Sequence, residues 1–320
     1  MALFLKLFEH KEPYQTLAEV NGGGVPSKCV VYIADRAKTI YHDTETQEDL
    51  SDFLCISTIG SEPSMVSMEI SVDENEVLPV EIEYTLDNGD EWIEWDFSEV
   101  AVPFLKEMRL RGNCPYGTAT QGGSSYCRFN ITNDGVDVYG SPHSLLGKSR
   151  RNTTTLLANG ENENVYHDIS FHKLFANNDK ILDSDGILLP ANTLSENCYG
   201  MMFYGCSLMG GTLYKLPALN LAKMCYNGMF AHTDIDRAPE LMAETSAPLA
   251  YQYMFNGCKD VNSVTMHIVE SNPYESGDNL CNGMLQGVAD EGTLYVPESD
   301  IADYFTETVC PTGWTVSFIE

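Results

Sequence analysis

The sequence predicts a multi-domain fold with an N-terminal β-hairpin anchor, an all-β sandwich and a C-terminal α/β solenoid. Three observations predict it: 320 residues exceed one ordinary hydrophobic core, short alternating strands fill the first half, and one apolar phrase recurs in the second half. The boundaries that we expect are 1–60 for the anchor, 61–146 for the sandwich, 147–164 for a linker, 165–292 for the solenoid and 293–320 for a C-terminal cap.

A brief apolar arm opens the chain and precedes a small hairpin. Runs 30–33 and 39–42 are rich in β-branched and aromatic residues, and 35–38 forms a turn between them. The arm is a candidate docking peptide that would bury apolar side chains on a partner; an ordinary first strand of the β domain is the alternative. Its apolar residues are Leu3, Phe4, Leu5, Leu7 and Phe8. Because the arm lacks a preceding basic region and a following small-residue cleavage site, it makes a poor signal peptide.

The pattern of residues 62–146 indicates short strands. Val66, Met68 and Ile70 alternate with polar residues, and Asn88-Gly89 is a strong hairpin turn. Further alternating runs follow, separated by turn residues. Short strands at this spacing predict a small β-sandwich of the immunoglobulin-like (Ig-like) type.

The second half repeats the phrase Cys-Tyr-x-x-Met-Phe with steps of 28, 27, 25 and 30 residues. A fixed apolar phrase at such a period is typical of a solenoid, in which each unit buries its apolar face against its neighbours. The closing pair of the phrase is Leu174-Phe175, Met202-Phe203, Met229-Phe230, Met254-Phe255 and Met284-Leu285.

Each unit is expected to be a short strand followed by a short helix. The apolar positions follow an i, i+1, i+4, i+5 stripe, which is one face of a helix. Residues that tolerate a left-handed conformation come three positions after each Met or Leu and would close that helix. They are Asn177, Gly205, His232, Gly257 and Gly287. The repeat core that we expect is Phe175, Tyr199, Met202, Phe203, Tyr226, Met229, Phe230, Tyr251, Met254 and Phe255.

Two runs make the repeat resemble a known family. Residues 189–206 (LPANTLSENCYGMMFYGC) and 251–258 (YQYMFNGC) are similar to the repeat of the BspA-like leucine-rich repeat proteins common in gut Bacteroides and their phages. The resemblance covers about residues 165–320 and implies an α/β leucine-rich-repeat solenoid. The fourth unit departs from the pattern with Ala250 where the family places Cys, and the fifth has Leu285 in place of Phe.

Charge excludes one class of partner. The chain carries 47 acidic and 18 basic residues, a formal net charge of −29, whereas a nucleic-acid groove needs a basic footprint. No stretch approaches the roughly 20 apolar residues of a membrane span, so we expect no membrane insertion.

The ten cysteines are not spaced for zinc. Cys198, Cys225, Cys206 and Cys258 fall on repeat-equivalent positions, where a free thiol packs as a small hydrophobe. A disulfide between Cys114 and Cys127 is left open.

Three charged or titratable clusters are candidate sites with an ordinary structural alternative. Carboxylates at Asp87, Asp90, Glu91 and Glu94 do not match a calcium loop and are expected in a solvated turn. His172 and His232 lie within repeats and are expected to be structural. The basic cluster of Lys148, Arg150 and Arg151 would form linker salt bridges, with an acidic partner surface as the alternative.

The resemblance and the apolar arm favour a virion structural protein of a phage. It would be a head or tail fibre or decoration subunit, docked by its N-terminus to capsid or tail proteins. Its solenoid would present a surface to a host glycan or protein, through many weak contacts multiplied by copy number. The resemblance also implies a homo-oligomer, a trimer as in related fibres. We expect no enzyme, no cofactor and no metal. A bacterial surface adhesin is one alternative. The other is a fibre-borne glycan hydrolase, which no sequence motif indicates.

Overall fold

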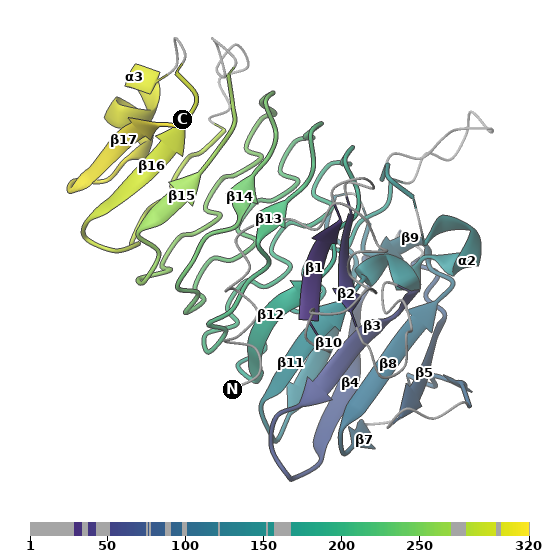
Figure 1. Cartoon of the computed structure of the whole chain (residues 1–320). Helices are drawn as coiled ribbons and strands as arrows, with labels where there is room; N and C mark the ends of the chain where they lie inside the picture. Colours follow the sequence, from purple (N-terminus) through teal and green to yellow (C-terminus); the bar gives the residue numbers. More distant parts are fainter. Residues whose placement is uncertain are drawn as a thin grey trace, which may run out of the picture.

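A computed structural model describes the backbone of residues 29–33 and 38–42 and the chain at 52–74, 76, 78–86, 91–97, 101–120, 122–151, 153–156, 168–269, 280–298 and 302–319. A two-sheet β unit is continued by a stack of coils that runs to the C-terminal sheet (Figure 1). The proposed docking arm, residues 3–8, lies outside the described residues.

The two-sheet unit pairs a three-stranded with a six-stranded sheet. The smaller sheet has the order β10 (Tyr126–Thr132), β4 (Ser64–Ser71), β7 (Val102–Phe104). The larger has the order β12 (Ile181–Ile187), β11 (Val136–Gly140), β3 (Leu54–Thr58), β8 (Glu107–Gly112), β5 (Ile82–Leu86), β6 (Ile93–Glu94). Alternating apolar residues meet between the sheets, among them Val66 and Phe129 from one and Ile56 from the other, all fully buried.

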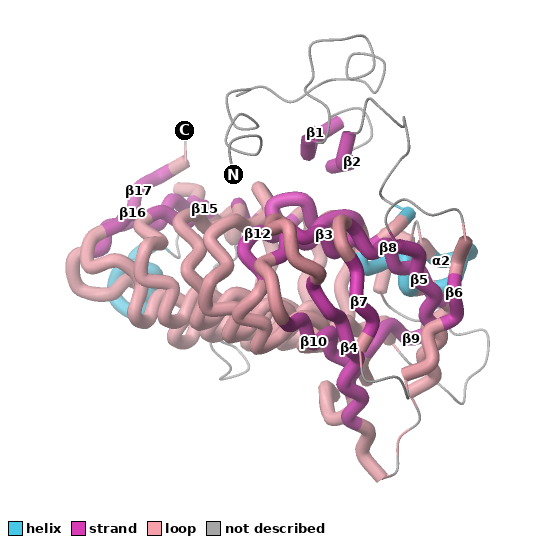
Figure 2. Tube along the Cα trace, turned by 90° about the horizontal axis from the view of Figure 1, so that it is seen from below, coloured by secondary structure: helices cyan, strands magenta, loops and turns pink. Residues whose placement is uncertain are grey.

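Two short elements complete this part of the chain. β1 (Cys29–Ile33) and β2 (Lys38–His42) pair as an antiparallel hairpin, with Val31 opposite Ile40. β1 lies beside β12 and β2 beside β11, and Figure 2 shows the hairpin above the larger sheet. β9 (Pro115–Thr118) leads toward the first coil, where the amides of Thr118 and Ala119 donate to the carbonyl of Ser170.

The expected α/β leucine-rich-repeat solenoid is wrong, because the described chain is nearly all β and no helix occurs in any repeat. The helical segments of the described part are short and lie elsewhere: η4 (Pro142–Leu145), α2 (Gly147–Arg150), α3 (Ala302–Tyr304) and the π-helical η5 (Phe305–Val309). The segments predicted as helices are arcs of consecutive turns (Figure 1). We call them the arcs: 170–178, 198–206, 225–233, 250–258 and 280–288.

Backbone hydrogen bonds explain why the arcs are not helices. The amides of Tyr199, Met201 and Phe203 donate to carbonyls of the next arc at 2.9, 2.7 and 3.0 Å. Between them, the amide of Met202 bonds the carbonyl of Tyr199, three residues back, at 3.3 Å. Alternate amides therefore join neighbouring coils, as in a sheet, while the others close β-turns. In a helix, amides after the first turn would instead bond carbonyls four residues back in the same segment.

Every second turn has a left-handed residue at its third position, as a type II turn requires; Met201 and Gly205 hold this position in the turns that the amides of Met202 and Cys206 close. The five residues expected to be left-handed are so, with φ of 58° at Asn177, 72° at Gly205, 61° at His232, 78° at Gly257 and 75° at Gly287. They close turns and not helices. Four residues earlier, Lys173, Met201 and Tyr253 are also left-handed, at 61°, 55° and 55°.

Short parallel strands form another side of the coils. β13 (Lys215–Leu216) pairs with β14 (Glu240–Leu241), and β15 (Ser263–Thr265), β16 (Gly292–Val296) and β17 (Trp314–Phe318) form the last sheet. α3 and η5 connect β16 to β17 and bury Phe305. This connection closes the end of the stack.

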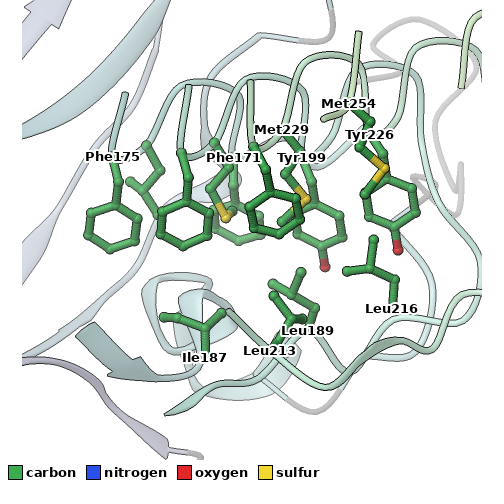
Figure 3. Packing of buried hydrophobic residues seen from close by; sticks show 14 of the residues in the cluster. Phe171, Phe175, Ile187, Leu189, Tyr199, Leu213, Leu216, Tyr226, Met229 and Met254 are labelled. Carbon is green, nitrogen blue, oxygen red and sulfur yellow. The ribbon is translucent and has the colours of Figure 1, made fainter. Parts of the chain in front are cut away.

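Stacked rings fill the coils. Phe175, Phe203, Phe230 and Phe255 form one ladder, with successive ring centroids 5.4, 5.9 and 6.1 Å apart. Tyr199, Tyr226 and Tyr251 of the second to fourth arcs form another ladder, with ring centroids 5.8 and 6.0 Å apart. Figure 3 shows Phe171, Phe175, Tyr199 and Tyr226 in their rows above aliphatic side chains from the other side of the coils, which are Ile187, Leu189, Leu213 and Leu216. At most 1% of the surface is exposed for each predicted core residue: Phe175, Tyr199, Met202, Phe203, Tyr226, Met229, Phe230, Tyr251, Met254 and Phe255.

The hydrophobic core is continuous from the two-sheet unit into the coils. Phe129 of β10 lies 5.5 Å from Phe175 of the first arc, measured between ring centroids. β12 extends the larger sheet by parallel pairing with β11, so a strand of the coil region is also a strand of the two-sheet unit. One apolar cluster extends from Leu54 to Trp314.

Candidate interaction surfaces

Nearly all the described cysteines are buried, and those of the repeat-equivalent positions, Cys198, Cys206, Cys225 and Cys258, are free thiols. Cys114 and Cys127 form no disulfide, and burial raises the pKa of their thiols to about 11 and about 12. Cys198 and Cys225 are fully buried in neighbouring arcs, where burial also raises the pKa of both thiols. Thiols that stay protonated are poor nucleophiles and poor metal ligands, so these cysteines serve packing.

The buried histidines are also structural. His143 of η4 was not singled out from the sequence; its Nε2 lies 2.8 Å from Oη of Tyr199 and its ring stacks on Phe171. Complete burial lowers the pKa of His143 to about 3, so it is neutral. Burial lowers the pKa of His172 to about 4. His232 is exposed on the third arc and meets the ring of Tyr204 edge-on at 5.4 Å.

The basic cluster is divided by the structure. Arg150 donates to the carbonyl of Pro115 at 2.5 Å, whereas Lys148 is exposed. Arg151 is partly buried, and burial lowers the pKa of its guanidinium. Arg150 is therefore engaged with the backbone, and Arg151 is partly withdrawn from solvent, so the three cations do not form one exposed patch.

The acidic turn does not form a site in the described residues. Asp87 and Asp90 lie outside them. Glu94 on β6 is exposed and faces Glu83 across the sheet. Among the described residues, no group of three or more His, Cys, Asp or Glu side chains is placed to hold a metal ion.

An acidic cluster that the sequence did not indicate lies where β11 pairs with β12. Asp137 stands opposite Asp183, whose Oδ1 accepts from the backbone amide of Asp185 at 2.6 Å. Oδ1 of Asp185 lies 3.5 Å from Nη2 of Arg237. Burial, followed by repulsion from Asp183, raises the pKa of Asp137 and of Asp185 to about 7. One arginine thus faces several partly buried carboxylates at the joint between the two-sheet unit and the coils.

The coils present two chemically different outer sides. The strand side carries the charged side chains of Lys215, Arg237 and Glu240, and Oε1 of Glu240 lies 2.8 Å from Nε2 of His267. The arcs 198–206, 225–233, 250–258 and 280–288 contain no Asp, Glu, Lys or Arg. On a chain with a net charge of −29, this uncharged side is the most distinctive surface in the described residues.

Scans of family models, of curated proteins and of solved structures each found no match to this chain. Within the part that the structure describes, none of the helices has the length and apolar character needed to cross a membrane.

Proposed function

We propose that this chain is a structural and attachment subunit of a phage virion, a head or tail fibre or decoration protein. Its partners would be capsid or tail proteins, which the N-terminal segment contacts, and further copies of the chain in a homo-oligomer. It would be no enzyme. The coils would project from the particle and present their outer surface to the host.

The observation that supports this proposal most is the distribution of the aromatic side chains in the coils. The buried rings of the first four arcs form ladders that hold one coil to the next, such as Phe203 between Phe175 and Phe230. The result is an elongated object with a long outer surface (Figure 2), a form suited to many weak contacts repeated over copies. Residues 189–206 resemble repeats of proteins from gut Bacteroides and their phages, and the phage members of that group support the virion location.

The location can be tested by quantitative peptide mass spectrometry on density-purified, nuclease-treated phage particles and on the envelope fraction of the host. The proposal predicts a fixed number of copies per particle. Replacing Leu3, Phe4, Leu5, Leu7 and Phe8 by serine should lower incorporation at least tenfold, while a matched set of polar-to-polar changes between residues 9 and 16 should not. Recovery of the chain only from bacterial envelopes would instead support the adhesin alternative.

A further inference from the structure

Six side chains form a compact uncharged patch on the third to fifth arcs, which we call the arc ridge: His232, Gln252, Tyr253, Asn256, Asn282 and Gln286. All are exposed or half-exposed. None of them is an acid, a lysine or an arginine, and the arcs that carry them contain no such residue. The ridge therefore offers amides and aromatic rings on arcs that carry no carboxylate.

Tyr253 occupies the centre of the ridge in a strained conformation. Its φ of 55° is unusual for a bulky residue, and 41% of its surface is exposed. The same position is glycine in the neighbouring arcs, Gly228 and Gly283. Lys173 and Met201 adopt the same conformation at this position of their arcs, so the turns and the bonds between coils impose it and fix the place of the tyrosine.

Glycine in the next arc leaves room for the edge of the ring. A Cβ on Gly283 would collide with Cε1 and Cδ1 of Tyr253, so this edge of the ring meets the backbone of the fifth arc. His232 lies over Gly257 in the same way, because a Cβ there would come within 2.7 Å of its Nδ1. One edge of the Tyr253 ring thus contacts the next arc, and the residue remains open to solvent.

Amide pairs on both sides of Tyr253 are held in place by hydrogen bonds between arcs. Nδ2 of Asn227 donates to Oε1 of Gln252 at 2.7 Å, and Nδ2 of Asn256 donates to Oε1 of Gln286 at 3.2 Å. A side-chain amide has two N–H donors and a carbonyl with two lone pairs, so each pair keeps capacity for a ligand. Fixing these rotamers in advance reduces the entropy lost on binding.

We propose that the arc ridge binds a neutral polysaccharide, with one sugar ring stacked on Tyr253 and its hydroxyl groups bonded to the amides of Gln252, Asn256 and Gln286. A sugar ring combines an apolar C–H face with hydroxyl groups that both donate and accept hydrogen bonds. The exposed ring of Tyr253 and the side-chain amides beside it match these two properties. A net charge of −29 opposes an acidic polysaccharide. This inference specifies the ligand class and the face for the attachment role proposed above and rests on that role for its biological setting.

The purified full-length chain can be tested on an array of neutral and acidic polysaccharides, followed by biolayer interferometry on the neutral polysaccharide that binds best. Tyr253→Gly removes the ring and places in the left-handed slot the residue that Gly228 and Gly283 already provide, so the fold is kept. We expect Kd to rise at least tenfold for Tyr253→Gly and several-fold for Gln286→Ala. Tyr214→Ala, which removes a tyrosine that is 63% exposed beside the strand side, is the matched control and should leave Kd unchanged.

Three results would overturn the inference. They are no binding to any neutral polysaccharide, binding only to acidic polysaccharides that salt abolishes, and equal effects of Tyr253→Gly and Tyr214→Ala. Analytical ultracentrifugation of both variants measures their oligomeric state. Loss of a dimer in Tyr253→Gly alone would show that the ridge is an interface between copies of the chain and would also overturn the inference. None of these results affects the particle assay, so the two proposals can fail separately.

Discussion

Gly228→Ala gives opposite outcomes for an arc of turns and for a helix. In the interior of a helix, alanine is favoured over glycine by about 1 kcal/mol. Gly228 instead has a φ of 57°, in the left-handed region. A Cβ there would meet only Cγ of Met201 at 3.5 Å and Cδ2 of Tyr204 at 3.9 Å, so the effect is conformational and not a collision.

The expected magnitude follows from two opposing contributions. Holding alanine in the left-handed region costs about 1–2 kcal/mol, and the lower entropy of its unfolded chain offsets about 0.4–1 kcal/mol. Gly228→Ala should therefore lower the free energy of unfolding by about 1 kcal/mol.

Urea denaturation of the full chain, followed by tyrosine and tryptophan fluorescence, measures this change through the midpoint at constant slope. Met201→Gly, the reverse change at the same position of the preceding arc, is the control and should not destabilise by more than a few tenths of a kcal/mol. A more stable Gly228→Ala would refute the turn-based account of the arcs.

Three further predictions concern the core and the joint. Phe230→Ala should lower the free energy of unfolding by about 3–5 kcal/mol, because it opens a cavity in the phenylalanine ladder. Phe318→Ala, at a side chain that is 52% exposed, should cost under about 1 kcal/mol in the same urea assay. Equal losses for the two variants would contradict the ladder. Tyr199→Phe leaves Nε2 of the buried His143 without its hydroxyl partner, so the free energy of unfolding should fall by about 1–3 kcal/mol, measured by thermal unfolding at pH 7. An unchanged stability would show that this hydrogen bond does not hold the two segments together. Burial raises the pKa of Asp137 from 3.8 to about 7, so its ionisation lowers the free energy of unfolding progressively from about pH 4 to pH 7. Asp137→Asn should therefore gain stability relative to wild type over this range, by up to about 4 kcal/mol. A stability difference between the two proteins that does not change with pH would show that burial does not penalise this carboxylate.

The burial of the repeat core could be predicted from the sequence, but the conformation that achieves it could not. Tyr226 and Phe230 recur in phase with their counterparts, and only stacking can hide such residues in units this short. A helix advances about 400° over four residues, only about 40° from full turns, so an i, i+1, i+4, i+5 stripe fits both a 3.6-residue helix and four-residue turns. Arcs of nine residues are too short for this phase difference to accumulate.

The left-handed residues gave a partial signal. Gly205 and Gly257 suggested a left-handed conformation correctly. Met201 and Tyr253 gave no such signal, because side chains of this size avoid that region unless packing and hydrogen bonds between coils impose it. A second left-handed position four residues before the first distinguishes the arcs from helices, and Gly228 and Gly283 mark that position in only some units.

Contacts distant in sequence could not be anticipated. His143 reaches Tyr199 across 56 residues, and nothing local in either segment indicates the pairing. β12 contains Asp183 and Asp185, which argue against a buried strand on composition alone, yet it joins the larger sheet beside β11. The acidic cluster at the joint is visible only once these strands are paired.

The central claim is that the repeats form arcs of turns, joined by hydrogen bonds from one coil to the next. Amide hydrogen exchange by NMR on the labelled full chain tests it most directly, supported by backbone chemical shifts that report φ. The account predicts chemical shifts typical of a left-handed conformation at Met201 and Tyr253, and slow exchange of the amides of Tyr199 and Phe203. Phe255→Ala lies two coils away and should speed the exchange of these two amides together with that of Phe230. Helical shifts throughout residues 198–206 and 225–233, with protection independent of the neighbouring coil, would contradict it.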